Sequence, residues 1–314
     1  MVKKYDPSGY LPGLLLSTND AKIGYYAVRS FWIESGLRFQ EEPLLNSLSA
    51  SKQIAGVGQK GTLIPDHERI QTWKDYTNAL YDEESAVSWE KNATLRLLRH
   101  VVEKHSLSRK HFDQIILGRE KDVDMKQYPT VKSLEDHGEM SCGSLFKLVL
   151  ECGGIHQSDS NSIIFDAARE VGITHGLANA LRTSVPTASA TGKVIVPLEL
   201  CEKYGVRSPR YLLNALGMGD EECKRHLQSA VEDIVTVARH HLVKAREKKD
   251  ELASHPMGAI AASVFLPALA SETFLNRLEK HGFDLQDRTL RSVGKIEHMQ
   301  CAGKLVAASL QKTF

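Results

Sequence analysis

Apolar residues recur every three or four positions along most of this chain, which is the spacing of one face of a helix. The clearest case is residues 66–82, where the apolar face is made by Ile70, Trp73, Tyr76 and Leu80. The same spacing predicts helices over 19–35, 86–104 and 219–253. The last of these segments ends in basic residues, which suit the negative end of a helix dipole.

β-Structure has a single candidate, the segment VIVPLEL at 194–200. Pro197 argues against it, because proline cannot donate a hydrogen bond to a sheet. The chain of 314 residues has the length of two average domains or of one large helical domain. The pattern as a whole predicts an all-α fold.

The stretch LANALRTSVPTAS, residues 177–189, combines a helical pattern with polar side chains. It reads like the end of a helix that runs into a turn at Pro186, since proline disrupts the interior of a helix. Asn179 and Arg182 lie three apart, and hydroxyl side chains follow without any acidic residue. The stretch is a binding site, the remnant of one, or only a helix end.

Two segments are candidate contact surfaces. The first is the long loop 41–65, whose Gly56, Gly58 and Gly61 follow a GxGxxG spacing. No strand precedes these glycines and no helix starts at them, so the spacing does not indicate a phosphate-binding loop. The second is MGAIAASVFLPALA, 257–270, which is either a core helix or an amphipathic contact with a membrane or partner. A core helix is the simpler interpretation.

The composition excludes several classes of function. The formal net charge is +1, whereas a nucleic-acid-binding domain usually has a clear basic excess, so no nucleic acid partner is expected. Five cysteines without a CxxC pair predict reduced, mostly buried thiols rather than disulfides or a zinc site. No run of about 20 apolar residues occurs, so we expect no membrane-spanning helix.

Motifs of catalysis are also missing from the sequence. It contains no HExxH and no GxSxG. The residues CGS at 142–144 are interpreted as a small-residue surface that lets two helices approach closely, rather than as a nucleophile turn. Asp122 and Asp124, two apart, diverge on a helix and are interpreted as a surface pair. These residues alone do not establish an enzyme.

A resemblance to a known family begins around the stretch 177–189. The segment AAREVGITHGLANALRTSVPTASATGKVIVPLEL, 167–200, resembles the second signature of squalene and phytoene synthases. The matching positions are Gly172, Leu177, Asn179, Leu181, Arg182, Gly192 and Pro197, while Lys193 replaces an arginine. Further segments follow the family order over 10–295. Within the family, the early GYLPGLLL and the LRTSVP in place of LRD are similar to the branch of mitochondrial complex I assembly factors.

The resemblance implies a fold and a kind of site. The fold is a single-domain, all-α bundle of the squalene/phytoene synthase type around a central cavity, spanning 1–314 with an inserted loop at 41–65. Active members carry two DxxxD motifs on facing helices. Because residues four apart share a helix face, each motif presents two carboxylates that hold Mg²⁺ against the diphosphate of the substrate.

This chain departs from the family pattern at all four acids. Alignment places Gly36 and Gln40 at the first motif. It places Thr183 and Thr187 at the second. Glu34 is close in sequence, but two residues before Gly36 on a helix it faces away. Glycine offers no ligand and hydroxyls bind Mg²⁺ more poorly than carboxylates. The resemblance therefore predicts a pseudoenzyme with no metal and no cofactor.

Four polar residues remain near the two motifs: Arg29, Asn179, Arg182 and Lys193. One interpretation is a residual site for an anion or a lipid head group. The other is hydrogen bonding across the floor of the former cavity. We favour the second, because an unpaired arginine in a closed cavity would be costly.

The expected function is non-catalytic. By resemblance, the protein is an assembly factor or accessory subunit of a mitochondrial complex, with respiratory complex I (NADH dehydrogenase) as the leading case. Its partners are then subunits of that complex, on the matrix side, with a peripheral contact to the inner membrane. The N-terminus lacks the character of a transit peptide, so either the chain stays where it is made or a presequence has been removed. The alternatives are a lipid or isoprenoid carrier and, less favoured, an active prenyltransferase.

Overall fold

The computed structural model describes residues 2–36, 66–82, 92–206, 221–291 and 295–314. Within these ranges the backbone is helical, and the β-structure is one isolated bridge between Gln127 and Val194. The elements are α1 (Val2–Tyr5), α2 (Pro7–Leu14), α3 (Asn19–Gly36), α4 (Asp66–Tyr81), α5 (Ala93–His105), α6 (Arg109–Val123), α7 (Val131–Gly138), η3 (Glu139–Gly143), α8 (Ser144–Cys152), η4 (Asp159–Asn161), α9 (Ser162–Thr191), α10 (Leu198–Lys203), α12 (Glu221–Glu247), α13 (Lys249–Ser254), α14 (Gly258–Phe265), α15 (Pro267–Lys280), α16 (Arg288–Arg291) and α17 (Lys295–Gln311). The prediction of an all-α fold is confirmed.

Local sequence signals set several helix ends. Asn92 caps α5 by accepting a hydrogen bond from the Leu95 amide at 2.9 Å. Thr130 and Ser133 form a capping box at the start of α7, each side chain accepting from the backbone of the other. Within the described residues, the helix predicted over 86–104 begins only at Ala93. The helices predicted over 19–35 and 66–82 are observed with nearly the expected bounds.

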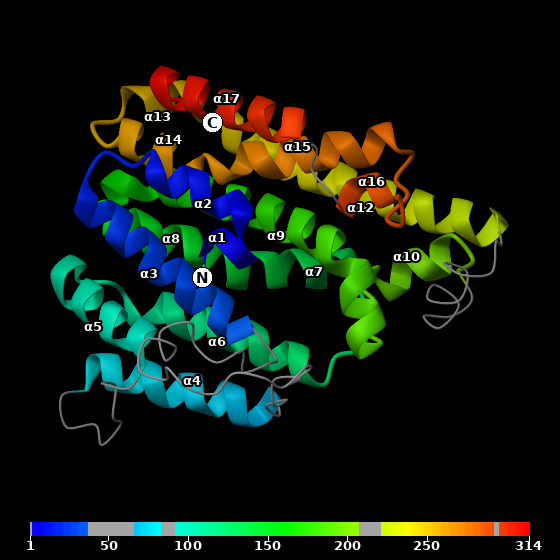
Figure 1. Ribbon diagram of the computed structural model, residues 1–314, viewed down its shortest axis with the longest axis horizontal. Coiled ribbons are helices and arrows are strands. Elements are labelled where there is room, and N and C mark those ends of the chain that lie inside the picture. Colours follow the sequence, from blue (N-terminus) through cyan, green and yellow to red (C-terminus); the bar gives the residue numbers. More distant parts are fainter. Residues whose placement is uncertain (1, 37–65, 83–91, 207–220, 292–294) are drawn as a thin grey trace, which may run out of the picture.

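Helix α9 passes through the middle of the molecule and joins its two main core clusters (Figure 1). Its first half belongs to the core cluster that also contains residues of α3, α5, α6 and α8, and its second half to the cluster that contains residues of α7, α12 and α15. The apolar core therefore runs along both sides of a single helix. This arrangement places the stretch 177–189 at the end of the most central element.

The contact of α9 with η3 and with the end of α7 depends on glycine. A Cβ atom on Gly172 would lie 2.3 Å from the Cα of Gly143, and one on Gly176 would lie 2.6 Å from the Cα of Gly138. The backbones can touch only because these side chains are missing. The interpretation of 142–144 as a small-residue helix contact is confirmed. The segment is a π-helical turn, a form that is often found at functional sites.

The predicted helix end at Pro186 is wrong, because α9 continues through this proline to Thr191. Pro186 lies on the exposed side of the helix, where water can bond to the freed carbonyl of Arg182. The buried Ser184 hydroxyl also donates to the Leu181 carbonyl at 2.7 Å. Packing of α9 against its neighbours therefore outweighs the local cost of proline.

The apolar segment 257–270 forms α14 and the start of α15, and its residues Ala261, Val264, Phe265, Leu266 and Ala268 are fully buried. By length and composition, Gly258–Lys280 could cross a membrane, but 61% of its apolar window is buried inside the fold. The core-helix interpretation fits this burial. Gln40 and the loop 41–65 lie outside the described residues, so the inserted loop stays a prediction.

Candidate functional site

The first motif position faces a cation. Gly36 is the last residue of α3, and a Cβ atom there would lie 3.1 Å from the guanidinium carbon of Arg119 on α6. Arg119 stacks over the ring of Trp32 at 5.4 Å and donates a long hydrogen bond to the Trp32 carbonyl at 3.4 Å. At the position where the family pattern has a carboxylate, this chain has a glycine, whose backbone lies beside an arginine.

Glu34 does not replace the missing acid. Its carboxylate accepts a hydrogen bond from the Thr94 hydroxyl of α5 at 2.6 Å. Burial raises the pKa of Glu34, and the hydrogen bond from Thr94 only partly opposes this shift. The prediction that Glu34 faces away from Gly36 is confirmed, since the Glu34 side chain points to α5 whereas Gly36 faces α6.

The second motif position also lacks metal ligands. Thr183 is exposed, and its hydroxyl donates to the Asn179 carbonyl of its own helix at 2.9 Å. Thr187 follows one turn later and is half-buried. Arg182 donates to the side-chain oxygen of Asn179, so these two residues form a local pair on α9.

Arg29 is the most deeply buried charged residue of this region. It has no exposed surface and forms an ion pair with Asp6, the residue that caps α2 through the Gly9 amide at 3.0 Å. Its guanidinium lies 4.9 Å from the ring centre of Tyr25 and 6.0 Å from that of Phe146. The pair fixes the N-terminal helices on the bundle. The sequence did not predict a role for Asp6, because nothing in its local pattern indicates a partner 23 residues away.

Lys193 belongs to a separate, neutralised cluster. Its ammonium group lies 2.8 Å from Asp122, which also accepts a hydrogen bond from Tyr128 at 2.7 Å. Burial would raise the pKa of Asp122, but His137 and Lys193 outweigh it and lower the pKa below its ordinary value. The interpretation of Asp122 as a surface acid is wrong. The bridge between Gln127 and Val194 brings Lys193 onto α6 and covers this carboxylate.

The residues at the two motif positions do not fit a magnesium–diphosphate site. Mg²⁺ is held in proteins chiefly by carboxylate oxygens. Gly36 supplies no ligand, the Thr183 hydroxyl is used by its own helix, and Arg119 places a positive charge beside the first position. The part of the chain that the structure describes holds no group of three His, Cys, Asp or Glu side chains that could bind a metal ion.

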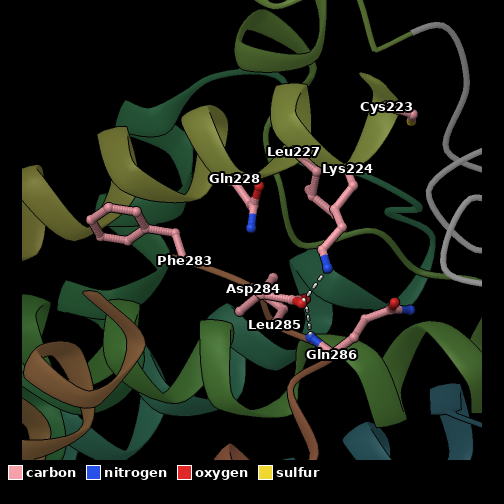
Figure 2. Close-up of a pocket in the computed structure, with 8 residues that line it drawn as sticks. All are labelled: Cys223, Lys224, Leu227, Gln228, Phe283, Asp284, Leu285 and Gln286. Atoms are coloured by element: carbon pink, nitrogen blue, oxygen red, sulfur yellow. Dashed lines mark hydrogen bonds and ion pairs between the residues drawn. The ribbon is translucent and has the colours of Figure 1, made fainter. Parts of the chain in front are cut away.

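A small recess lies elsewhere, between α12 and the turn after α15 (Figure 2). In this recess Lys224 reaches Asp284 at 2.9 Å. It has room for about one water molecule, which is far too small for a prenyl chain. The central cavity implied by the resemblance stays a prediction.

A sequence model of the squalene/phytoene synthase family matches residues 51–295. The chain belongs to this family. The match includes the second motif on α9, whereas α3 and the first motif precede it. The family membership that the residues around 177–189 predict is thereby confirmed.

Three relatives align along most of the chain. The Drosophila melanogaster protein named NADH dehydrogenase (ubiquinone) complex I, assembly factor 6 homolog is 27% identical, over 92% of this chain and 76% of its own. A Dictyostelium discoideum protein of the same name is 28% identical, over 90% and 69%. The human assembly factor 6 of complex I is 26% identical, over 91% and 74%.

Solved structures of family members share the fold. A dehydrosqualene synthase crystallised with a ligand superimposes with a TM-score of 0.68 at 16% identity, covering 99% of this chain and 94% of that one. The squalene synthase HpnC from Alicyclobacillus acidocaldarius gives 0.61 at 16% identity, covering 90% and 93%. At these identities the likeness establishes the all-helical isoprenoid synthase fold and carries nothing about activity.

Proposed function

We propose that this protein acts in the assembly of mitochondrial respiratory complex I, the NADH dehydrogenase, and does not catalyse prenyl transfer. The observation that carries the proposal is the similarity to proteins of fly, amoeba and human that bear the name complex I assembly factor 6. This similarity extends over 90–92% of the chain. The partners are subunits of the forming complex, and the site of action is the mitochondrial matrix.

The state of the two motifs supports the non-catalytic part of the proposal. Ionising a prenyl diphosphate requires positive charge on the departing diphosphate, which active members obtain from metal ions held by carboxylates. Here the four positions hold Gly36, Gln40, Thr183 and Thr187. An acidic pair spaced by four occurs neither in 29–40 nor in 177–192. An active prenyltransferase is therefore not favoured.

A cellular test addresses the role directly. Human cells that lack assembly factor 6 would receive this chain behind a mitochondrial presequence, with a dehydrosqualene synthase of the same fold as the control. We expect the chain to restore complex I on native gels, and the synthase to fail. The chain should migrate with assembly intermediates and be absent from the mature complex. If complex I stays absent while the folded chain accumulates in the matrix, the proposal is wrong.

A peripheral contact with the inner membrane is proposed for α17. This helix packs on α2 and α15 at the edge of the molecule (Figure 1). Its outer face exposes Met299 (74%), Val306 (46%) and Leu310 (79%), and Lys304 and Lys312 are also exposed. No acidic residue occurs from 299 to 314. Apolar side chains with basic neighbours suit an anionic lipid surface.

Vesicle flotation tests this contact. The vesicles are made of phosphatidylcholine with or without phosphatidylglycerol, and the paired substitution is Met299→Ser with Leu310→Ser. Leu97→Ser with Val243→Ser removes exposed apolar residues from other helices and serves as the control. We expect the wild type and the control to float with the anionic vesicles, and the α17 variant to stay behind. If the wild type does not float, the proposed membrane contact is wrong.

A further inference from the structure

The N-terminal helices α1 and α2 and the C-terminal helix α17 lie outside the two main core clusters. Among the described residues, neither cluster contains a side chain of these three helices. Instead, α2 and α17 meet in a third, small cluster together with the start of α15. Its buried members are Leu266, Leu305 and Ala308, and Leu11 and Leu15 pack against them. We call α1, α2 and α17 the outer layer, because they are held to one another apart from the main core.

The strongest contacts between α2 and α3 are polar. Asp6, the cap of α2, forms an ion pair with the buried Arg29 of α3. The Tyr25 hydroxyl donates to the Gly9 carbonyl at 2.7 Å, and the Tyr26 hydroxyl donates to the next carbonyl at 2.8 Å. Single hydrogen bonds of this kind stabilise a fold only modestly, whereas removing one partner of a buried ion pair is costly. The position of α2 therefore depends most on the ion pair.

Helix α2 is weak by its own sequence. Three of its eight residues, Gly9, Pro12 and Gly13, are poor helix formers. Pro12 has no backbone N–H, so one turn of the helix lacks its hydrogen bond. An isolated helix of this length is not stable in water. Gly13 does fit the docked position, since a Cβ atom there would lie 2.7 Å from ring carbons of Tyr25 and Tyr26. Helix α2 is thus folded because it is docked.

The closed form leaves part of Arg29 unsatisfied. Its Nε and Nη2 atoms are buried and have no hydrogen-bond partner among the described residues. Buried donors without partners are costly. When α2 leaves α3, water reaches these atoms and the carboxylate of Asp6. Part of the free energy that is lost with the ion pair is thereby regained, which lowers the cost of opening at this place.

We propose that the outer layer opens as one unit while the main core stays folded, and that the ion pair of Asp6 and Arg29 is the latch that keeps it closed. Helix α2 lies between the latch on α3 and the third cluster on α17, so the loss of either support weakens the other. Local units of this kind open below the free energy of global unfolding. Opening exposes Arg29 with the Tyr25 and Tyr26 hydroxyls, which the N-terminal segment pairs in the closed form. Neither the assembly role nor the membrane contact is needed for this opening.

Hydrogen–deuterium exchange of the full chain, followed by mass spectrometry of its peptides, tests the unit. In the wild type we expect the slowest amides of α2 and α17 to share one protection factor. This factor should be at least about tenfold below that of the slowest amides of α12. Equal protection in the outer layer and in α12 would mean that the layer opens only when the whole protein unfolds. That result, or unequal protection in α2 and α17, would overturn the proposal.

Asp6→Asn tests the latch. Asparagine can still cap α2, but it leaves the charge of Arg29 unpaired. We expect exchange to become about a hundredfold faster or more in both α2 and α17. Asp113→Asn, at an exposed ion pair with Arg109 on α6, is the matched control. It should leave both helices at wild-type rates, because opening of the outer layer does not break that pair. Acceleration in α2 alone, or in neither helix, would contradict the proposal.

Leu305→Ala on α17 gives the reciprocal test and leaves the latch intact. The substitution removes a buried side chain of the third cluster. Because coupling between two elements is reciprocal, α2 should exchange at least about tenfold faster together with α17. Circular dichroism checks that the variants are folded, and Leu305→Ala decides alone if Asp6→Asn does not fold. Wild-type exchange in α2 beside faster exchange in α17 would show that the two helices open separately, against the proposal.

Discussion

Two groups of charged side chains in the helical bundle differ in how well they are paired. In the first half of α9, His241 of α12 lies 2.5 Å from Glu170 and 3.2 Å from Glu135 of α7. Arg169 bridges Glu139 and Glu170 at 2.8 and 2.9 Å. By contrast, Arg29 of α3 has one acidic partner, Asp6, and its Nε and Nη2 atoms are buried without a hydrogen-bond partner among the described residues. The first group joins α7, α9 and α12 through ion pairs, whereas the second contains buried donors that the described residues do not satisfy.

The largest effect should appear at the buried ion pair of Asp6 and Arg29. Arg29→Met leaves the Asp6 carboxylate buried without its arginine, and such a loss typically costs about 3–5 kcal/mol of unfolding free energy. Urea unfolding measures the change. The double variant Asp6→Asn with Arg29→Met should recover much of it, because the isolated charge is gone. Equal losses in the single and the double variant would contradict this account of the pair.

Breaking the first group of ion pairs should cost less and should depend on pH. Burial works against the charged form of His241, but the hydrogen bonds that Glu170 and Glu135 accept from it outweigh burial and raise the pKa of His241 above 6.5. For Glu170, His241 outweighs burial and lowers the pKa below 4.5. The stabilisation is thus fully present between these two values. It is lost as the pH rises through the folded pKa of His241, or falls through that of Glu170.

Glu170→Gln should therefore destabilise the protein by about 1.5–3 kcal/mol near pH 6, and by less near pH 9. Urea unfolding at several pH values measures the difference between variant and wild type. Glu202→Gln on α10 is an exposed control that should change little. A loss that is constant across this pH range would contradict the assignment of the stabilisation to a charged His241.

His175 is a buried residue of α9 and should limit the stability of the protein in acid. Burial, strengthened by the charge of Arg29, lowers its pKa to about 3. The unfolded chain takes up this proton near pH 6.5, so stability is full above that value and is lost as the pH falls toward 3. His175→Gln should shift the midpoint of acid unfolding to lower pH, with a gain of roughly 1–2 kcal/mol at about pH 5. A midpoint that does not move would contradict the prediction.

The smallest effect on stability is expected at Arg182. Because this arginine has no acidic partner among the described residues, Arg182→Gln should change the unfolding free energy by less than about 0.5 kcal/mol. Arg169→Gln on the same helix removes two ion pairs and should cost more, about 0.5–1 kcal/mol. Urea unfolding of both variants measures the contrast. A larger loss at Arg182 than at Arg169 would reverse the expected order.

The sequence alone predicted the fold and the family, but only part of the candidate site. Helix periodicity and the matches around 167–200 depend on local spacing, which a single sequence contains. The orientation of Glu34 away from Gly36 also follows from spacing alone. These features were predictable because a helix fixes the direction of each side chain relative to its neighbours.

The remainder depends on contacts between distant segments. Asp6 meets Arg29, and Lys193 meets Asp122, only after the helices pack. Arg119 lies on α6, yet nothing in the local sequence shows that it faces Gly36 on another helix. The passage of α9 through Pro186 likewise reflects tertiary packing that overrides a local preference.

The central claim is that this scaffold no longer performs magnesium-dependent prenyl transfer. Purified protein incubated with farnesyl diphosphate and Mg²⁺, with an active dehydrosqualene synthase as the positive control, tests it through release of pyrophosphate. We predict no release above that of buffer alone, and no dependence on Mg²⁺. Magnesium-dependent release of pyrophosphate together with a coupled C30 product would contradict the account.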